Sequence, residues 1–175
     1  NMLLYIYEKG VRNNVHVLGV AGSTVCPAII YFSKYIDNLT YDSASYAQGR
    51  INCNMILPFS MSFIQLSNRN SLLQKLPCEC VICKDLVDIK DITDIYYYQI
   101  LTAHNLKITI EYNKVLDKAK YDKDVFKNIC MNDKIGLVLE YIDYGIINGR
   151  LKANEKYKGY LKTLDKDKSK SLFAF

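Results

Sequence analysis

The stretch VHVLGVAGSTVCPAIIYFSKYIDNLTYD, residues 15–42, decides the fold of this chain. Its first six residues are almost continuously apolar, which is the pattern of a short strand buried on both faces. Small residues then supply a turn and a helix cap at Thr24, and apolar side chains recur on one helical face through about Tyr35. A second extended run, residues 38–42, ends at Asp42. Strand, helix and strand with short connections predict a right-handed βαβ unit whose strands are parallel.

A cysteine cluster follows this unit. Residues 78–83, Cys-Glu-Cys-Val-Ile-Cys, bring Cys78, Cys80 and Cys83 together, and His104 lies further along the chain. Three thiolates and one imidazole are the tetrahedral ligand set of a structural zinc site, and the alternative is a chance clustering of cysteines. A helix capped at Asp91 or Thr93 would present His104 on its last turn. The sequence therefore predicts Zn²⁺ bound by these four side chains.

Helical periodicity marks most of what remains. The first 14 residues have the pattern of a helix end and a polar turn, and further helices are expected around residues 108–119, 125–129 and 138–145, the last of them ended by Gly145. We divide the chain into a strand-and-helix segment at 1–70, a zinc-binding helical segment at 71–150 and a basic polar tail at 151–175. The predicted fold class is α/β with a mainly helical zinc subdomain.

Composition limits the class of protein. The chain has 175 residues, of which 50% are hydrophobic, a net charge of +5 and six cysteines. It holds no apolar run long enough to span a membrane and no signal-peptide pattern, so we expect a cytoplasmic protein with no membrane partner and its other cysteines as thiols. Lysines concentrate between Lys152 and Lys170. This tail either contacts phosphates or is a solvated terminal segment.

Two segments in this order resemble the tRNA-guanine transglycosylase family, which includes queuine- and archaeosine-type enzymes and a DNA-modifying 7-deazaguanine branch. The first runs from His16 through Gly19 to the run Tyr41-Asp-Ser-Ala-Ser-Tyr-Ala47, with Arg50 beyond it. The second is Pro77 with the cysteine cluster, followed by His104-Asn-Leu. The sequence that follows Asp42 is closer to that of the archaeosine and DNA-modifying branches, because the proline-threonine-arginine triplet of the bacterial queuosine branch is absent.

The resemblance implies a (β/α)₈ barrel of the TIM type, of which this chain would supply only the carboxyl-terminal strand-helix units beside the zinc subdomain. Asp42 would then be the nucleophile that attacks the ribose anomeric carbon when guanine is exchanged for a 7-deazaguanine. Leu18 and Gly19 would line the base pocket, although the sequence alone favours a core position for Leu18 over a pocket position. The weaker candidates for sugar-phosphate contacts are Ser43, Tyr46 and Arg50.

The family's second catalytic aspartate, its general acid/base, belongs to the missing half of the barrel. The expected partners are therefore tRNA or DNA, a 7-deazaguanine base, and either a second copy in a homodimer or a complementing amino-terminal half. Two alternatives to an enzyme half stay open. One is a non-catalytic zinc-stabilised module that binds nucleic acid or protein, and the other is a gene relic that retains its fold.

Overall fold

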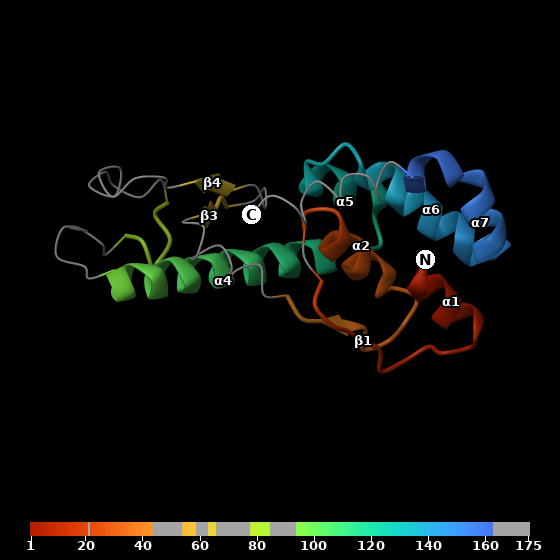
Figure 1. Cartoon of the computed structure of the whole chain (residues 1–175), viewed down its shortest axis with the longest axis horizontal. Coiled ribbons are helices and arrows are strands. Elements are labelled where there is room, and N and C mark those ends of the chain that lie inside the picture. The colour runs from red at the N-terminus through yellow and green to blue at the C-terminus, as the bar shows by residue number, and fades with distance from the viewer. Residues whose placement is uncertain (21, 44–53, 59–62, 66–77, 85–93, 163–175) are drawn as a thin grey trace.

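Helices make up most of the computed structural model, which describes residues 1–20, 22–43, 54–58, 63–65, 78–84 and 94–162. Figure 1 shows one long helix, α4, with a small β-hairpin beside one half of it and a group of helices around its other end. The elements in chain order are α1 (Met2–Glu8), β1 (His16–Val17), α2 (Val25–Phe32), β2 (Thr40–Tyr41), β3 (Asn54–Ile56), β4 (Phe63–Gln65), α4 (Asp94–Ala119), α5 (Lys123–Cys130), α6 (Ile135–Asn148) and α7 (Arg150–Lys156).

The predicted βαβ unit is present. Strands β1 and β2 pair in parallel, with His16 opposite Thr40 and Val17 opposite Tyr41, and α2 connects them. The strands are shorter than the apolar runs that predict them. The described residues therefore show one parallel strand pair, and the barrel stays an expectation from the resemblance.

Strands β3 and β4 form a separate antiparallel pair, in which Met55 lies opposite Ile64. Met55 is fully buried, and β3 lies against α4. From sequence alone, residues 51–59 could form either a strand or a loop, and part of that stretch lies outside the described residues.

Helix α4 is longer than predicted and places His104 differently. The sequence analysis ended one helix at the turn holding His104 and began another near Ile108, but a single helix runs from Asp94 to Ala119. No glycine or proline interrupts these 26 residues, so nothing in the backbone chemistry stops the helix. His104 consequently projects from the middle of a rigid element.

The main hydrophobic core lies where the second half of α4 meets α1, α2, α5, α6 and α7. Segments 1–70 and 71–150 of the sequence division both contribute to this single core. Residue 153 of α7, within the expected polar tail, is also buried there. The buried members are Leu4, Ile30, Tyr31, Phe32, Ile36, Tyr112, Leu116, Ala119, Phe126, Cys130, Ile135, Leu139, Tyr141, Ile142 and Ala153.

The sequence analysis expected Gly145 to end α6, but the helix does not end there. The helix continues to Asn148 and is followed by Gly149, whose φ of 89° only glycine adopts easily. A Cβ atom on Gly145 would stand 2.5 Å from Cδ1 of Leu4, so this glycine makes room for α1 against α6. Its role is therefore close packing and not helix termination.

One finding bears on the membrane expectation. None of the described helices is both long and apolar enough to cross a membrane.

Candidate metal centre and strand-end carboxylate

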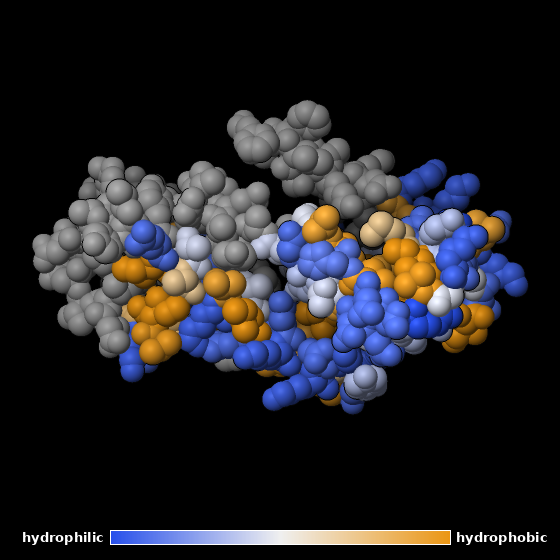
Figure 2. Space-filling view, turned by 90° about the horizontal axis from the view of Figure 1, so that it is seen from below, coloured by the Kyte–Doolittle hydropathy of each residue, from blue (hydrophilic) through white to orange (hydrophobic). Residues whose placement is uncertain are grey.

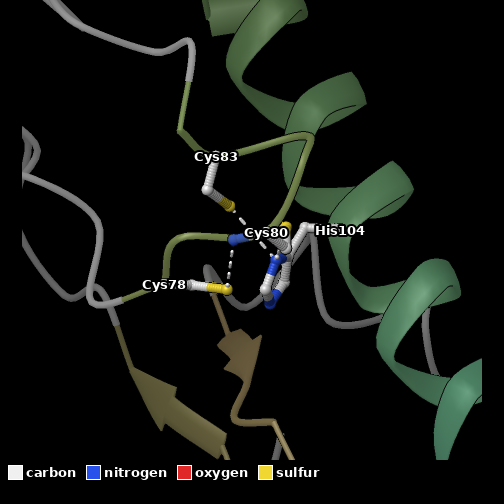
Figure 3. A group of neighbouring side chains, drawn as sticks. All are labelled: Cys78, Cys80, Cys83 and His104. Carbon is white, nitrogen blue, oxygen red and sulfur yellow. Dashed lines mark hydrogen bonds between the residues drawn. The ribbon is translucent and has the colours of Figure 1, made fainter.

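The four predicted metal ligands come together. Figure 3 shows Cys78, Cys80 and Cys83 on a tight loop, with their sulfur atoms facing His104 on α4. One donor atom from each residue lies within 4.8 Å of the other three. Cys78 and Cys83 are buried, Cys80 is half-buried and His104 has no exposed surface. Four residues that lie at most 26 positions apart in sequence thus converge on one small volume that can hold a metal ion.

The loop geometry explains how three sulfur atoms share one side. The backbone N–H groups of Cys83 and Lys84 both donate to the carbonyl of Cys80, at 2.8 and 2.9 Å, and so close a turn. The N–H of Cys80 donates to Sγ of Cys78 at 3.4 Å. Backbone N–H donors to sulfur stabilise the thiolate form that metal ions bind.

The donor set fits zinc in type and spacing. Nδ1 of His104 lies 3.4 Å from Sγ of Cys80 and 3.2 Å from Sγ of Cys83. A tetrahedral site with zinc about 2.3 Å from sulfur and 2.0–2.1 Å from nitrogen has edges of about 3.5–3.8 Å. Three thiolates with one imidazole also favour zinc over hard cations such as Mg²⁺.

The thiols differ in acidity. Burial raises the pKa of Cys80, but hydrogen bonds to its sulfur outweigh burial, and the pKa falls to about 7. Burial raises the pKa of Cys83, and the negative charge of Cys80 raises it further. Burial also raises the pKa of Cys78. Three negative charges in this volume require a cation, so the site is built to release protons as it takes up a metal ion.

A second shell fixes the orientation of His104. Its Nε2 lies 2.8 Å from the backbone oxygen of Ile56 in β3, and a carbonyl oxygen can only accept a hydrogen bond. Nε2 therefore carries the proton, and the lone pair of Nδ1 points at the sulfur atoms. This is the arrangement that metal-binding histidines commonly have.

A second group of predicted residues meets at the ends of β1 and β2. Oδ1 of Asp42 accepts a hydrogen bond from the backbone N–H of Gly19, and the backbones of Asp42 and Val20 are also bonded. Gly19 has a φ of 65°, a conformation that glycine adopts without strain. Asp42 is exposed, and the Leu18 side chain is 75% exposed, so Leu18 is not a core residue of the described chain.

The remaining predicted residues divide into two groups. Ser43 follows Asp42 and is half-buried, whereas Tyr46 and Arg50 lie outside the described residues. His16 is not one of the four predicted metal ligands, and its Nδ1 atom lies 2.8 Å from the Thr40 hydroxyl. It belongs to the strand pair and not to the metal centre.

Sequence reasoning missed Asn105 as part of the metal centre. Its side chain is fully buried and bonds to β3 beside His104. The only signal in the sequence was a polar residue next to a predicted ligand. Nothing in the sequence indicated that Asn105 and His104 both bond to the backbone of Ile56.

The chain was compared with protein-family models, curated proteins and solved structures, and none of them matches it.

Proposed function

We propose that this chain is the carboxyl-terminal portion of a nucleic-acid guanine transglycosylase, with zinc held by Cys78, Cys80, Cys83 and His104. In this proposal zinc is structural, since four protein donors leave it no open position for chemistry. The observation that carries the enzymatic part is the position of Asp42, whose carboxylate lies at the shared carboxyl end of two parallel strands. In parallel α/β sheets and barrels, this end is where reactive side chains gather.

The reaction assigns each group at the strand ends a task. An oxygen of Asp42 attacks the anomeric carbon of the nucleotide while the bond to guanine breaks, which forms a covalent glycosyl-enzyme. The incoming 7-deazaguanine then attacks the same carbon and displaces Asp42, so that the configuration is retained. The Gly19 N–H holds one carboxylate oxygen and so orients the other. The exposed Leu18 side chain offers an apolar contact for the face of a purine.

The proposal requires a partner. The proton transfers at guanine need a second acid/base group, which the resemblance assigns to the other half of a TIM-type barrel. Support for a partner comes from the β1–β2 pair, which has two strands among the described residues, because parallel sheets are normally wider and covered on both faces. A complementing amino-terminal half or a second copy would supply the missing strands.

Base exchange tests the proposal directly. Labelled guanine is offered with bulk tRNA or with DNA, first to this chain alone and then to the chain mixed with a matching amino-terminal half. We expect incorporation only in the mixture, into one of the two polymers, and its loss in Asp42→Asn. Asp37→Asn is the matched control, because Asp37 is an exposed aspartate that lies three residues before the same strand, away from Gly19. Equal exchange by the Asp42→Asn variant would contradict the assigned nucleophile.

One observation favours a second candidate, a non-catalytic zinc-stabilised module that binds nucleic acid or protein. The bond from Gly19 N–H to Asp42 also joins the ends of β1 and β2, which is a structural task needing no chemistry. Under this alternative, Asp42→Asn leaves saturable binding of tRNA or DNA unchanged and no exchange occurs in any mixture.

A further inference from the structure

We infer that Asn105 is a positioning residue for the metal centre: it clamps β3 against α4 so that the Ile56 carbonyl selects the metal-binding tautomer of His104. The inference goes beyond the ligand set and rests on the proposed binding of zinc. It concerns a side chain that contacts no metal and acts through the backbone of another segment.

The clamp consists of two hydrogen bonds from one side chain. Oδ1 of Asn105 accepts the backbone N–H of Ile56 at 2.8 Å, and Nδ2 donates to the backbone oxygen of Asn54 at 2.9 Å. Residues 54 and 56 point their backbone groups to the same edge of the strand, since alternate residues of a strand do so. The amide of Asn105 therefore occupies the place that a neighbouring strand would take.

His104 bonds to the same edge of β3 as Asn105. Its Nε2 atom bonds to the Ile56 oxygen at 2.8 Å, so both polar groups of the Ile56 backbone are bonded to adjacent residues of α4. With the Ile56 N–H and the Asn54 carbonyl both bonded to Asn105, the strand segment that carries the Ile56 carbonyl is held beside His104. The imidazole is then held with Nε2 protonated and Nδ1 bare, as ligation through Nδ1 requires.

Burial makes this clamp consequential. Both His104 and Asn105 have no exposed surface, and Ile56 is 6% exposed. Water cannot replace a lost bond at such a site, so removing the amide leaves a backbone N–H and a carbonyl unsatisfied. The strand would shift to recover partners, and the Ile56 carbonyl would move with it. Second-shell partners of this kind usually change metal affinity about 10–100-fold when they are removed.

The test uses the full chain and three variants. Asn105→Ala removes both bonds, and Asn105→Asp keeps the shape and the acceptor for the Ile56 N–H but loses the donor to Asn54. Asn113→Ala is the matched control, because Asn113 is an asparagine two turns further along α4 and outside the donor cluster. Zinc affinity is measured by competition with a chromophoric chelator, and the protonated ring nitrogen of His104 is identified by ¹⁵N nuclear magnetic resonance.

We expect the zinc Kd to rise about 10–100-fold in Asn105→Ala, with a smaller rise in Asn105→Asp and no change beyond about twofold in Asn113→Ala. The metal-free wild type should show His104 protonated at Nε2, and Asn105→Ala should show a mixture of tautomers. Far-UV circular dichroism checks that the helices are retained. Unchanged affinity and an unchanged tautomer in both Asn105 variants would overturn the inference while leaving the metal site intact. A wild-type chain that binds no zinc would instead overturn the metal site itself.

Discussion

The two parts of α4 are stabilised by different chemistry. In residues 94–110, which we call the metal end, the helix contacts β3 and places His104 beside the loop of residues 78–84. In residues 111–119, the helical end, it packs against α2 and α5, in a core to which α1, α6 and α7 also contribute. The polar side chains that are buried in the described part of the chain, His104, Asn105 and Thr109, all belong to the metal end.

This difference shows where each region obtains its stability. Aromatic and aliphatic side chains fill the helical end. Tyr31 and Phe126, for example, make an edge-to-face contact with their ring centroids 5.3 Å apart. The metal end instead buries thiols, an imidazole and an amide, which need partners to be stable out of water. We therefore expect the helical end to fold by apolar burial and the metal end to depend on its ion.

The outer side of α4 at the metal end adds to this contrast. Figure 2 shows apolar atoms gathered along this part of the helix, where Leu106 is 38% exposed and Ile110 is 44% exposed. Some apolar side chains of the metal end are thus exposed to solvent and do not contribute fully to its core.

Metal removal should have the largest effect. Structural zinc sites contribute apparent free energies of about 10–16 kcal/mol in small zinc domains. Treatment with a strong chelator should lower the amide protection of residues 101–109 by several orders of magnitude, while protection in α6 changes less than about tenfold. Hydrogen exchange with and without the chelator measures both. A uniform loss of protection along the chain would contradict the division into two ends.

Truncation of the helical core comes next. Phe126 has no exposed surface, and Phe126→Ala should lower the free energy of unfolding by about 3–5 kcal/mol through lost burial and a cavity. Urea unfolding followed by circular dichroism gives the value, with Phe126→Leu as a milder control. Zinc affinity should stay within about twofold of the wild type. A parallel loss of zinc binding would mean that the two ends are not separable.

Asp143 provides a pH-dependent test of the helical end. It lies on α6 and accepts hydrogen bonds from Tyr31 and Tyr35 of the α2 region and from Lys123 of α5. Burial raises the pKa of Asp143, but the bond from Lys123 and those from the tyrosines outweigh burial, so the pKa lies below its ordinary value of 3.8. This carboxylate therefore stabilises the fold fully above the unfolded-state pKa of about 3.9, and the contribution is lost as pH falls through the lower folded-state pKa.

Asp143→Asn should accordingly cost about 2 kcal/mol near neutral pH, a value discounted for the partial exposure of the group. The stability difference between the variant and the wild type should shrink as the pH falls through the lowered folded-state pKa of Asp143. Unfolding free energies measured between pH 2 and 7 test this. A constant difference between the two proteins over that range would show that the charge of Asp143 has no part in it.

The smallest effect concerns α1. Gly145→Ala should destabilise the chain by about 1 kcal/mol, since crowding against Leu4 exceeds the gain in helix propensity. Gly136→Ala is the control, because its added Cβ would meet only the flexible end of Lys127, at 3.2 Å. The midpoints of thermal unfolding of both variants are compared with that of the wild type. Equal or higher stability in Gly145→Ala would mean that α1 is not tightly packed on α6.

Local chemistry was predictable from sequence, and long-range packing was not. The βαβ unit and the set of four metal donors follow from short patterns, because apolar periodicity and the spacing of thiols are local properties. The run of α4 through His104 was missed because the sequence analysis ended the helix where its motif ended. The prediction for Gly145 was wrong because sequence alone does not distinguish a glycine that makes room for Leu4 from a glycine that ends a helix. The clamp by Asn105 depends on a strand that precedes it by 49 residues.

The most direct test of the account is the metal content of the purified chain and of single cysteine variants. We predict one zinc per wild-type chain, replaceable by Co²⁺ with the absorption of a tetrahedral site that has three sulfur ligands and one nitrogen ligand. Cys83→Ser should lose the ion, whereas Cys130→Ser, which alters an equally buried thiol of the helical end, should keep it. A wild-type chain without zinc, or a Cys83→Ser variant that binds it as tightly as the wild type, would contradict the account.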